Sequence, residues 1–232
     1  MSSRRALVTG GASGIGAALV ERLEAEGFAV ESLDLTSGFD VSDPLHWDTV
    51  EPVEIACLNA GVLGGPADPA DIDLDAYRRA VAVNVDGVVL GVRRLARVMP
   101  EGGRIVCTAS LAGLMEIVDD PIYGATKHAV VGFVRSVAPT LAARGIAINA
   151  LCPGIAETPM LPPDTRKRFR EAGFPLLTAS EVATAAWLAL EAGTTGAAWV
   201  VQPGRPALEF RFPRVPGPRT GDASVGPPPS FS

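Results

Sequence analysis

The sequence contains few cysteines and histidines, and this shortage argues against disulfides, metal sites and a histidine-based triad. Its three cysteines, Cys57, Cys107 and Cys152, lie in apolar segments and lack the spacing of metal ligands. An odd number of cysteines in such segments favours buried thiols in a reducing compartment. The two histidines, His46 and His128, have no partner at the spacing of a metal site or a catalytic triad. We therefore expect no metal, and we expect both histidines to be surface or packing residues.

Long apolar runs and clusters of charge of one sign are also missing. No apolar stretch is long enough to cross a bilayer, and the run that follows the first five residues is too short for a signal peptide. Lysines and arginines are scattered through a chain of net charge -6, which argues against a nucleic acid or an anionic membrane as partner. We therefore expect a cytoplasmic protein whose partners are small molecules.

What the sequence does contain is a regular alternation of short β-branched runs and helical segments. This alternation is typical of a parallel sheet with helices on both faces. It predicts a single doubly wound α/β domain over residues 1–205, with a kink where Pro139 interrupts a helix. Strands are expected at residues 5–9, 28–33, 53–58, 104–107, 145–151 and 198–201, and helices at 14–26, 74–99, 125–143 and 178–190.

Two stretches depart from this pattern. Residues 34–40 are too few for the crossover helix that usually joins the second and third strands of such a sheet, so we expect a loop there. Eight of the chain's 20 prolines lie between Pro203 and Ser232, which predicts a partly disordered tail over residues 206–232. Within it, Leu208, Phe210 and Phe212 alternate with charged residues. This strand-like period predicts docking, either on the core or on a neighbouring subunit.

A glycine-rich loop, residues 9–16, follows the first expected strand and opens the first helix. Free amides and closely approachable glycines in this position suit a dinucleotide pyrophosphate, although glycines also serve tight turns and the spacing differs from the usual G-x-G-x-x-G. Asp34 ends the second strand 18 residues after Gly16, and neither Ser13 nor Leu35 is basic. A carboxylate there would bind the ribose hydroxyls of NAD and repel the extra phosphate of NADP. We therefore expect NAD as cofactor, while Asp34 alone would equally suit a turn.

Tyr123 and Lys127 are four residues apart, a spacing that places both side chains on one face of a helix. Lowering the pKa of a phenol by about 3 units costs about 4 kcal/mol. An ammonium about 4.5 Å away supplies roughly 3.7 kcal/mol at an effective dielectric constant of about 20. The pair therefore predicts a tyrosine that works as a base near neutral pH, although the same spacing also occurs on ordinary amphipathic helices.

These motifs together resemble the short-chain dehydrogenase/reductase superfamily, a Rossmann fold, over about residues 7–204. The resemblance also includes Asn59-Ala60-Gly61, Asn84, Ser110 and Pro153-Gly154. A narrower similarity, to the NAD-linked 15-hydroxyprostaglandin dehydrogenase group, lies in residues 110–115, 127–128, 132–133 and 149–154. That group has a glutamine near its substrate three residues before the tyrosine, where this chain has Asp120.

The resemblance implies an NAD-dependent enzyme that interconverts a secondary alcohol and its ketone on a small, largely hydrophobic substrate, commonly as a homodimer or homotetramer. In it Tyr123 takes the hydroxyl proton, Ser110 holds the substrate oxygen, Lys127 binds the nicotinamide ribose and Asn84 holds a water. The implied cofactor contacts are Gly10, Ser13, Gly14, Ile15, Gly16, Asp34, Leu35, Asp40, Val41, Asn59, Ala60, Gly61, Tyr123, Lys127, Pro153, Gly154, Ile155 and Thr158, and the implied substrate contacts are Ser110, Ala112, Asp120, Tyr123, Met160 and Leu161.

Residues 155–177 stand where such enzymes close a lid over the substrate. Their basic residues, Arg166, Lys167, Arg168 and Arg170, either hold a substrate carboxylate or form a solvated helix face. Two other functions stay open. A carbonyl reductase working in the opposite direction would usually take NADPH, which Asp34 disfavours. A cofactor-sensing protein without catalysis would be expected to have lost some of the four catalytic residues, and all four are present.

Overall fold

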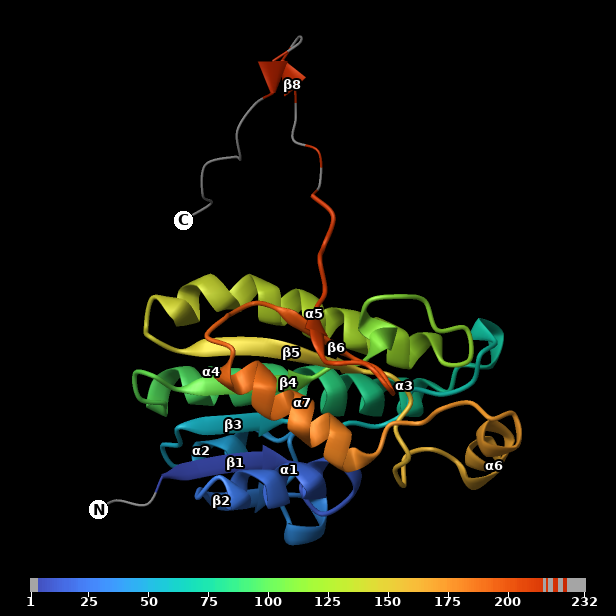
Figure 1. The fold of residues 1–232 in the computed structure, drawn as a ribbon, viewed down its shortest axis with the longest axis horizontal. Helices are drawn as coiled ribbons and strands as arrows, with labels where there is room; N and C mark the ends of the chain where they lie inside the picture. Colours follow the sequence, from blue (N-terminus) through green and yellow to red (C-terminus); the bar gives the residue numbers. More distant parts are fainter. Residues whose placement is uncertain (1–3, 215, 217–218, 221–222, 225–232) are drawn as a thin grey trace.

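A seven-stranded sheet forms the centre of the computed structural model, which describes residues 4–214, 216, 219–220 and 223–224 (Figure 1). The strand order is β2-β1-β3-β4-β5-β6-β7, and all neighbours are parallel except β6 and β7. The strands are β1 (Arg5–Thr9), β2 (Ala29–Leu33), β3 (Ile55–Leu58), β4 (Arg104–Thr108), β5 (Ala147–Pro153), β6 (Ala198–Val201) and β7 (Leu208–Glu209).

Helices cover both faces of the sheet, as the alternation in the sequence predicts. On one face, α1 (Gly14–Ala25) and α7 (Ala179–Glu191) pack against each other, in the foreground of Figure 1. On the other face lie α4 (Gly87–Val98) and α5 (Pro121–Ala142), with the short α2 (Pro44–Asp48) against α4. Successive side chains of a strand enter opposite cores, so strands buried on both faces read as unbroken apolar runs. The fold is therefore the doubly wound α/β sheet expected from the sequence.

The long helix expected at residues 74–99 is present, but its centre is wound differently. It begins as α3 (Leu74–Val81), continues as a π-helix over Ala82–Asp86 and ends as α4. Asn84 lies fully buried in the π-helical part. Short π-helical segments occur frequently at functional sites, and this one places Asn84 toward the end of the sheet described below.

Helix α5 begins at Pro121, four residues before the expected start at Ala125. The carboxylate of Asp120 caps its first turn, and proline at the first helical position has the backbone angle that a helix needs. The helix then continues through Pro139 to Ala142, so the proline does not end it. Tyr123 therefore lies in the first turn of α5, where the cap fixes its backbone.

The connection from β2 to β3 contains no long crossover helix. Residues 35–37 form a single 3-10 turn that ends at Gly38 in the left-handed conformation, with φ of 84°. In the strand order, β2 lies at the edge of the sheet. Strands β2 and β3 lie on opposite sides of β1, so the strand order reverses at β1. Ligands of doubly wound sheets bind at such a reversal.

The segment after β6 returns along the sheet and docks on the core of its own chain. Strand β7 pairs antiparallel with β6, and Phe210 and Phe212 pack against the core that includes α5. The guanidinium of Arg135, on α5, lies 3.7 Å from the centre of the Phe212 ring. Beyond these residues, β8 (Arg219–Thr220) and β9 (Ala223–Ser224) pair with each other away from the body of the molecule (Figure 1). Much of the tail over residues 206–232, for which we expected partial disorder, lies outside the described residues.

All three cysteines are free and buried, as expected. Burial raises the pKa of the Cys57 and Cys152 thiols to about 12, so neither forms a reactive thiolate near neutral pH. In the part of the chain that the structure describes, no helix has the length and apolarity needed to cross a membrane.

Candidate active site

A cleft of about 1420 Å³ opens at the carboxyl ends of the parallel strands. Residues that follow the strands line it, including Gly10 after β1, Asp34 after β2 and Asn59 after β3. The lining includes every cofactor, substrate and catalytic residue expected from the sequence except Gly16 and Asn84, which lie behind it. The structure therefore gathers residues from distant parts of the chain, from Gly10 to Gln202, into one cavity.

The glycine loop forms the end of the cleft beside β1. Gly10 and Gly14 have positive φ, at 67° and 54°. A Cβ atom at Gly16 would lie 1.9 Å from the backbone oxygen of Gly10, so only glycine lets α1 approach β1 this closely. Ser13 is the N-cap of α1, yet its side chain makes no capping hydrogen bond among the described residues. The first amides of α1 are thus available to an anion, which is the arrangement that holds a pyrophosphate.

The carboxylate of Asp34 stands beside this loop at the end of β2. It accepts hydrogen bonds from the amide of Ala12 at 3.2 Å and from the amide and hydroxyl of Thr36 at 2.9 and 2.8 Å. Partial burial raises the pKa of Asp34, but the hydrogen bonds from Thr36 and Ala12 outweigh it and lower the pKa below its ordinary value. The cleft therefore has a negative charge beside the glycine loop, at the end of β2.

Buried hydroxyl groups hold the next wall of the cleft together. The amides of Asn59 and Ala60 donate to the hydroxyl of Thr9 at 2.8 and 3.1 Å, and the hydroxyl of Thr108 donates to the side-chain oxygen of Asn59 at 3.1 Å. These bonds join the ends of β1, β3 and β4. We did not identify Thr9 or Thr108 from the sequence, although a threonine that ends an otherwise apolar strand is a recognisable signal.

Asp40 and Val41 line the cleft beyond Asp34. The carboxylate of Asp40 accepts from the amide and hydroxyl of Ser42 at 2.8 and 2.7 Å, and these bonds lower the pKa of Asp40. The carbonyl of Val41 accepts a hydrogen bond from the indole of Trp47 at 2.8 Å. Both residues are thus held rigidly, which suits the expected contact with an adenine ring.

Ser110, Tyr123 and Lys127 come together in the middle of the cleft. Ser110 follows β4, and its hydroxyl accepts from the amide of Ala112 at 3.1 Å and donates to the carbonyl of Pro153 at 3.5 Å. It also lies near enough to the Tyr123 phenol to lower the pKa of that group. The ammonium of Lys127 donates to the carbonyl of Thr108 at 2.8 Å and lies 5.4 Å from the centre of the Tyr123 ring. The hydroxyl after β4 and the two side chains of α5 therefore line the same cavity.

The pKa values of this pair differ from what we expected. Burial lowers the pKa of Lys127 to about 8. Burial also raises the pKa of Tyr123, and although the hydrogen bond with Ser110 lowers it, the charge of Asp120 and the neighbouring Cys152 raise it further. The expectation that Lys127 makes Tyr123 acidic is thus wrong for the protein on its own. Burial is the largest cause of the raised pKa of Tyr123.

Asn84 lies behind the cleft wall and is completely buried. Its side-chain oxygen accepts from the amide of Val62 at 2.8 Å, and its side-chain nitrogen donates to the carbonyl of Val62 at 2.9 Å and to the hydroxyl of Thr126 at 3.0 Å. It therefore fastens the chain after β3 to the π-helix and to α5. The role of Asn84 in holding a water stays a prediction.

Asp120 lines the cleft, but its carboxylate serves the protein's own structure. One oxygen accepts from the amide of Tyr123 at 2.9 Å, and the other accepts from the amide of Gly64 at 2.8 Å. The residue is only 7% exposed. The carboxylate is thus a buried cap, and the substrate contact that we expected here stays a prediction. The contact with Gly64, 56 residues away, left no signal in the sequence.

Residues 155–177 form a separate segment over the open side of the cleft. Ala156 and Leu177 form a β-bridge at its base, and α6 (Pro163–Glu171) lies at its outer end, to the right in Figure 1. The face of this segment toward the cleft is largely apolar: it includes Met160, Leu161, Phe169 and Phe174, together with Thr165 and Arg168. The same cleft is lined by Ser110 and Tyr123, so it has an apolar wall.

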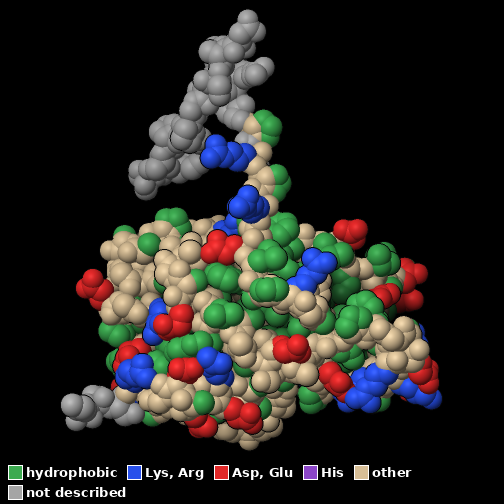
Figure 2. All heavy atoms as spheres, viewed as in Figure 1, with side chains coloured by type: hydrophobic (Ala, Val, Ile, Leu, Met, Phe, Trp, Pro, Cys, Tyr) green, Lys and Arg blue, Asp and Glu red, His purple; other side chains and the backbone are tan. Residues whose placement is uncertain are grey.

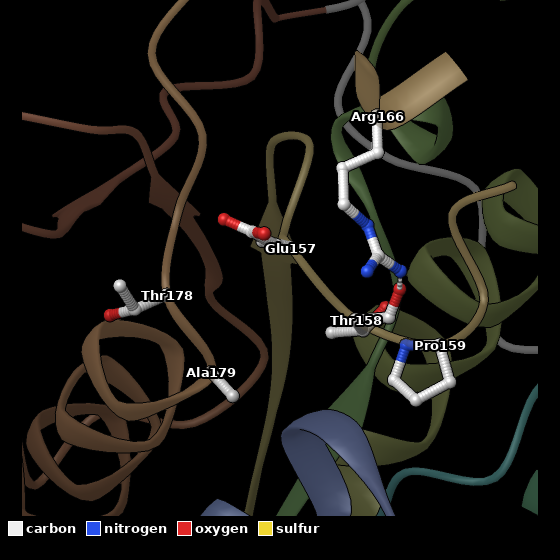
Figure 3. A pocket seen from close by; sticks show the side chains of 6 residues that line it. All are labelled: Glu157, Thr158, Pro159, Arg166, Thr178 and Ala179. Atoms are coloured by element: carbon white, nitrogen blue, oxygen red, sulfur yellow. Dashed lines mark hydrogen bonds between the residues drawn. The ribbon is translucent and has the colours of Figure 1, made fainter. Parts of the chain in front are cut away.

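The basic residues of α6 mostly bind within the segment itself. Arg166 donates to the carbonyls of Thr158 and Leu161 at 2.8 and 3.2 Å (Figure 3). Arg170 forms an ion pair with Glu157, while Lys167 lies 3.8 Å from Glu171. Basic and acidic side chains accordingly lie together over α6 in Figure 2. Arg168 alone among these four lines the cleft, so the run is chiefly a solvated and anchoring face.

A smaller depression of about 390 Å³ lies on the far side of these anchoring contacts. Figure 3 shows Arg166 along one side of it, bonded to the main chain at Thr158, with Thr178 on the opposite side. Thr178 is the N-cap of α7, and its hydroxyl and amide donate to the Glu181 carboxylate in a capping box. The depression is thus the space between the base of the 155–177 segment and α7. Its lining residues are Glu157, Thr158, Pro159, Arg166, Thr178 and Ala179.

Comparison with known proteins identifies the family. Residues 46–168 match the short chain dehydrogenase family. The chain is 34% identical over 197 residues to cis-4-hydroxycyclohexanecarboxylate dehydrogenase of Sinomonas cyclohexanicum, a match that covers 71% of this chain and 79% of that protein.

Solved structures agree with this assignment. The 3-ketoacyl-(acyl-carrier-protein) reductase from Brucella melitensis, complexed with NADH, superimposes with a TM-score of 0.78 at 27% identity, covering 87% of this chain and 98% of that one. BdcA, solved in complex with NADPH, superimposes with a TM-score of 0.76 at 28% identity, covering 85% and 92%. These relatives bind nicotinamide cofactors of both kinds. The chain belongs to the short-chain dehydrogenase family and is an oxidoreductase that acts on CH–OH groups.

Proposed function

We propose that the protein oxidises a secondary alcohol to its ketone, with NAD as the hydride acceptor and Tyr123 as the acid/base. The observation that carries this proposal is the meeting of Ser110, Tyr123 and Lys127 in a cleft that also holds the glycine loop and the Asp34 carboxylate. The narrower similarity of this chain to the 15-hydroxyprostaglandin dehydrogenase group is part of the same proposal. Its support is residues 110–115 and 149–154.

The residues present fit a nicotinamide dinucleotide. The free amides at the start of α1 would bind the pyrophosphate, and the carboxylate of Asp34 would bind the ribose hydroxyls and disfavour a 2′-phosphate. Thr158 and Ile155 would hold the nicotinamide end, and Thr158 lies beside the glycine loop, since a Cβ atom added at Gly14 would be 3.2 Å from its Cβ. The cofactor supplies the hydride acceptor.

The side chains of this protein supply the proton chemistry. Ser110 and Tyr123 are close enough to each other to bind the same substrate oxygen. Ser110 would donate a hydrogen bond to that oxygen as its charge changes, and the phenol of Tyr123 would take up the hydroxyl proton. Lys127 would stabilise the phenolate, a form that burial alone disfavours. The apolar wall formed by Met160, Phe169 and Phe174 would exclude water and select a hydrophobic substrate.

A second candidate is the reduction of a ketone by the same residues. It is supported by the raised pKa of Tyr123, because a protonated phenol is the form that donates a proton to a carbonyl oxygen. It is also supported by the Brucella melitensis relative, which is a reductase with NADH bound. Asp34 makes NADH the expected donor in this direction too.

The experiment that tests both candidates has a binding part and a turnover part. The purified protein is titrated with NADH and with NADPH, and the quenching of its tryptophan fluorescence is followed; NADH should bind at least about tenfold more tightly. A panel of hydrophobic secondary alcohols, hydroxysteroids and hydroxy fatty acids is then tested for NADH formation, and the matching ketones for NADH consumption. Tighter binding of NADPH would overturn the cofactor proposal, and NADH binding without turnover on any compound would favour a cofactor-sensing protein.

We also propose a cytoplasmic homodimer or homotetramer. Three buried, reduced thiols suit a reducing compartment. On α3, Leu74 is 60% exposed and Tyr77 is 41% exposed, and apolar side chains at the surface of a helix are suited to a subunit contact. Sedimentation velocity of the purified chain tests this proposal, and a monomer at micromolar concentration would contradict it.

A further inference from the structure

Residues 62–64, which follow β3, connect two of the proposed catalytic residues, Asn84 and Tyr123. Asn84 binds both the amide and the carbonyl of Val62. Two residues later, the amide of Gly64 donates to Asp120, and the same carboxylate accepts from the amide of Tyr123. Residues 62–64 therefore form a backbone strap, held by Asn84 at one end and by Asp120 at the other.

The strap is closely packed against Asp120 and the start of α5. A Cβ atom at Gly64 would lie 2.6 Å from the amide nitrogen of Tyr123, 2.6 Å from the Cβ of Ile122 and 2.7 Å from a carboxylate oxygen of Asp120. Gly64 and Asp120 are both buried. A movement of the strap would thus press directly on the first turn of α5, which contains Tyr123.

We propose that Asp120 is a positioning residue that fixes Tyr123 against the strap 62–64 and thereby sets its place relative to Ser110 and Lys127. The inference rests on the proposed role of Tyr123. It differs from a simple helix cap because one carboxylate oxygen is used for α5 and the other for a segment that is 56 residues away in the chain.

The charge of Asp120 adds an electrostatic effect. The groups that face the phenol of Tyr123 are Ser110, Lys127, Cys152 and Asp120, and Asp120 contributes the negative charge among them. A carboxylate near a phenol opposes the second negative charge that ionisation would create. Removing this charge should therefore make Tyr123 easier to ionise.

Asp120→Asn separates the strap from the cap. Asparagine is as good an N-cap as aspartate, so its oxygen keeps the bond to Tyr123. Its amide nitrogen cannot accept from Gly64, so the strap is released. Asp119→Asn is the matched control, since Asp119 is the exposed neighbour and its side chain makes no hydrogen bond among the described residues.

Two readouts need no substrate. In Asp120→Asn, hydrogen exchange at the Gly64 amide should become at least about tenfold faster while that of Tyr123 stays protected. The ultraviolet absorbance of tyrosinate should show a Tyr123 midpoint lower by about half a unit to one unit, measured in a Tyr77→Phe background where Tyr123 is the single remaining tyrosine. Asp119→Asn should change neither.

Turnover separates this inference from the proposed function. With a substrate from the panel, Asp120→Asn should lower kcat about tenfold and leave KM within about twofold, because it displaces a reacting group and not a binding surface. Unchanged exchange at Gly64, or an unchanged Tyr123 midpoint, would overturn the positioning role whatever the enzyme catalyses. Changes in both readouts, in a protein for which Tyr123→Phe leaves turnover intact, would support the strap and overturn the proposed function. If Asp120→Asn does not fold, Asp120→Ser, which is also a good cap, replaces it.

Discussion

The ammonium of Lys127 lies 5.4 Å from the centre of the Tyr123 ring, one helical turn away on the same face of α5. The spacing of the two residues in the sequence predicts this arrangement, and the structure confirms it. The consequence for the tyrosine is the reverse of the simple expectation, because both groups are buried. Burial disfavours the charged form of each, so the phenol holds its proton more tightly and the ammonium holds its proton less tightly.

Tyr123→Phe should abolish turnover while leaving the fold and cofactor binding intact. The substitution removes one hydroxyl, the group that exchanges a proton with the substrate, and loss of general acid/base catalysis costs about 10² to 10⁴ in rate. The Kd for NADH should stay within about twofold of the wild type in a fluorescence titration. Tyr77→Phe is the matched control, because Tyr77 is the other tyrosine of the chain and is 41% exposed. Equal kcat values for the two variants would remove Tyr123 from the mechanism.

Lys127→Met should abolish turnover and change how stability depends on pH. In the wild type, the pKa of Lys127 is about 8 in the folded state against 10.5 in the unfolded chain. Between these values the unfolded state binds more protons, so the free energy of unfolding rises with pH; below about pH 8 the full desolvation cost is present. Methionine carries no such group.

The measurement for Lys127 is urea denaturation of both proteins at a series of pH values. Relative to Lys127→Met, the wild type should gain about 3 kcal/mol of unfolding free energy as pH rises through the interval from about 8 to about 10.5. The lost bond to the Thr108 carbonyl shifts the whole curve of the variant but not its dependence on pH. A constant difference between the two proteins would show that Lys127 keeps its ordinary pKa in the folded state.

The fold could be predicted closely from the sequence, and the reason lies in how each element is encoded. Strands such as β1 and β4 are buried on both faces, so their residues form apolar runs that end at polar residues. The glycine loop and Asp34 are neighbours of such ends, so their place at the cleft follows from the strand order. Local information is sufficient in these cases.

The features that the sequence did not reveal depend on contacts between distant segments. The π-helix at Asn84 is stabilised by Val62 and Thr126, and the burial of Asp120 depends on Gly64. The pKa of Tyr123 depends on how completely the surrounding elements exclude water. None of these can be derived from spacing alone, because spacing fixes which side of a helix a residue faces and not what covers that side.

Asp34→Asn should weaken the preference for NADH over NADPH without disturbing the turn that follows β2. Asparagine can still accept the hydrogen bonds that Thr36 gives to the aspartate, so the 3-10 turn stays capped. The negative charge that would repel a 2′-phosphate is lost. The ratio of the Kd values for NADPH and NADH should fall by at least about tenfold, roughly 1.4 kcal/mol, at low salt. Asp43→Asn, the cap of α2, is a control for substitution of a capping aspartate. An unchanged ratio would place the ribose away from Asp34.

Gly16→Ala and Gly132→Ala form a pair of substitutions with opposite expected effects. Both glycines lie in helices, Gly16 in α1 and Gly132 in α5, and neither has a positive φ. Alanine restricts the unfolded chain, which by itself stabilises a protein by about 0.4 to 1 kcal/mol. At Gly132 no heavy atom lies within 4 Å of the added Cβ, so that gain should appear in full. At Gly16 the Cβ would lie 1.9 Å from the backbone oxygen of Gly10, so α1 must move away from β1.

Thermal unfolding should show a higher Tm for Gly132→Ala and a lower Tm for Gly16→Ala, and fluorescence titration should show weaker NADH binding for Gly16→Ala alone. Normal NADH affinity in Gly16→Ala would mean that the cofactor does not bind at the start of α1, because the glycine loop cannot keep its shape once this contact is broken.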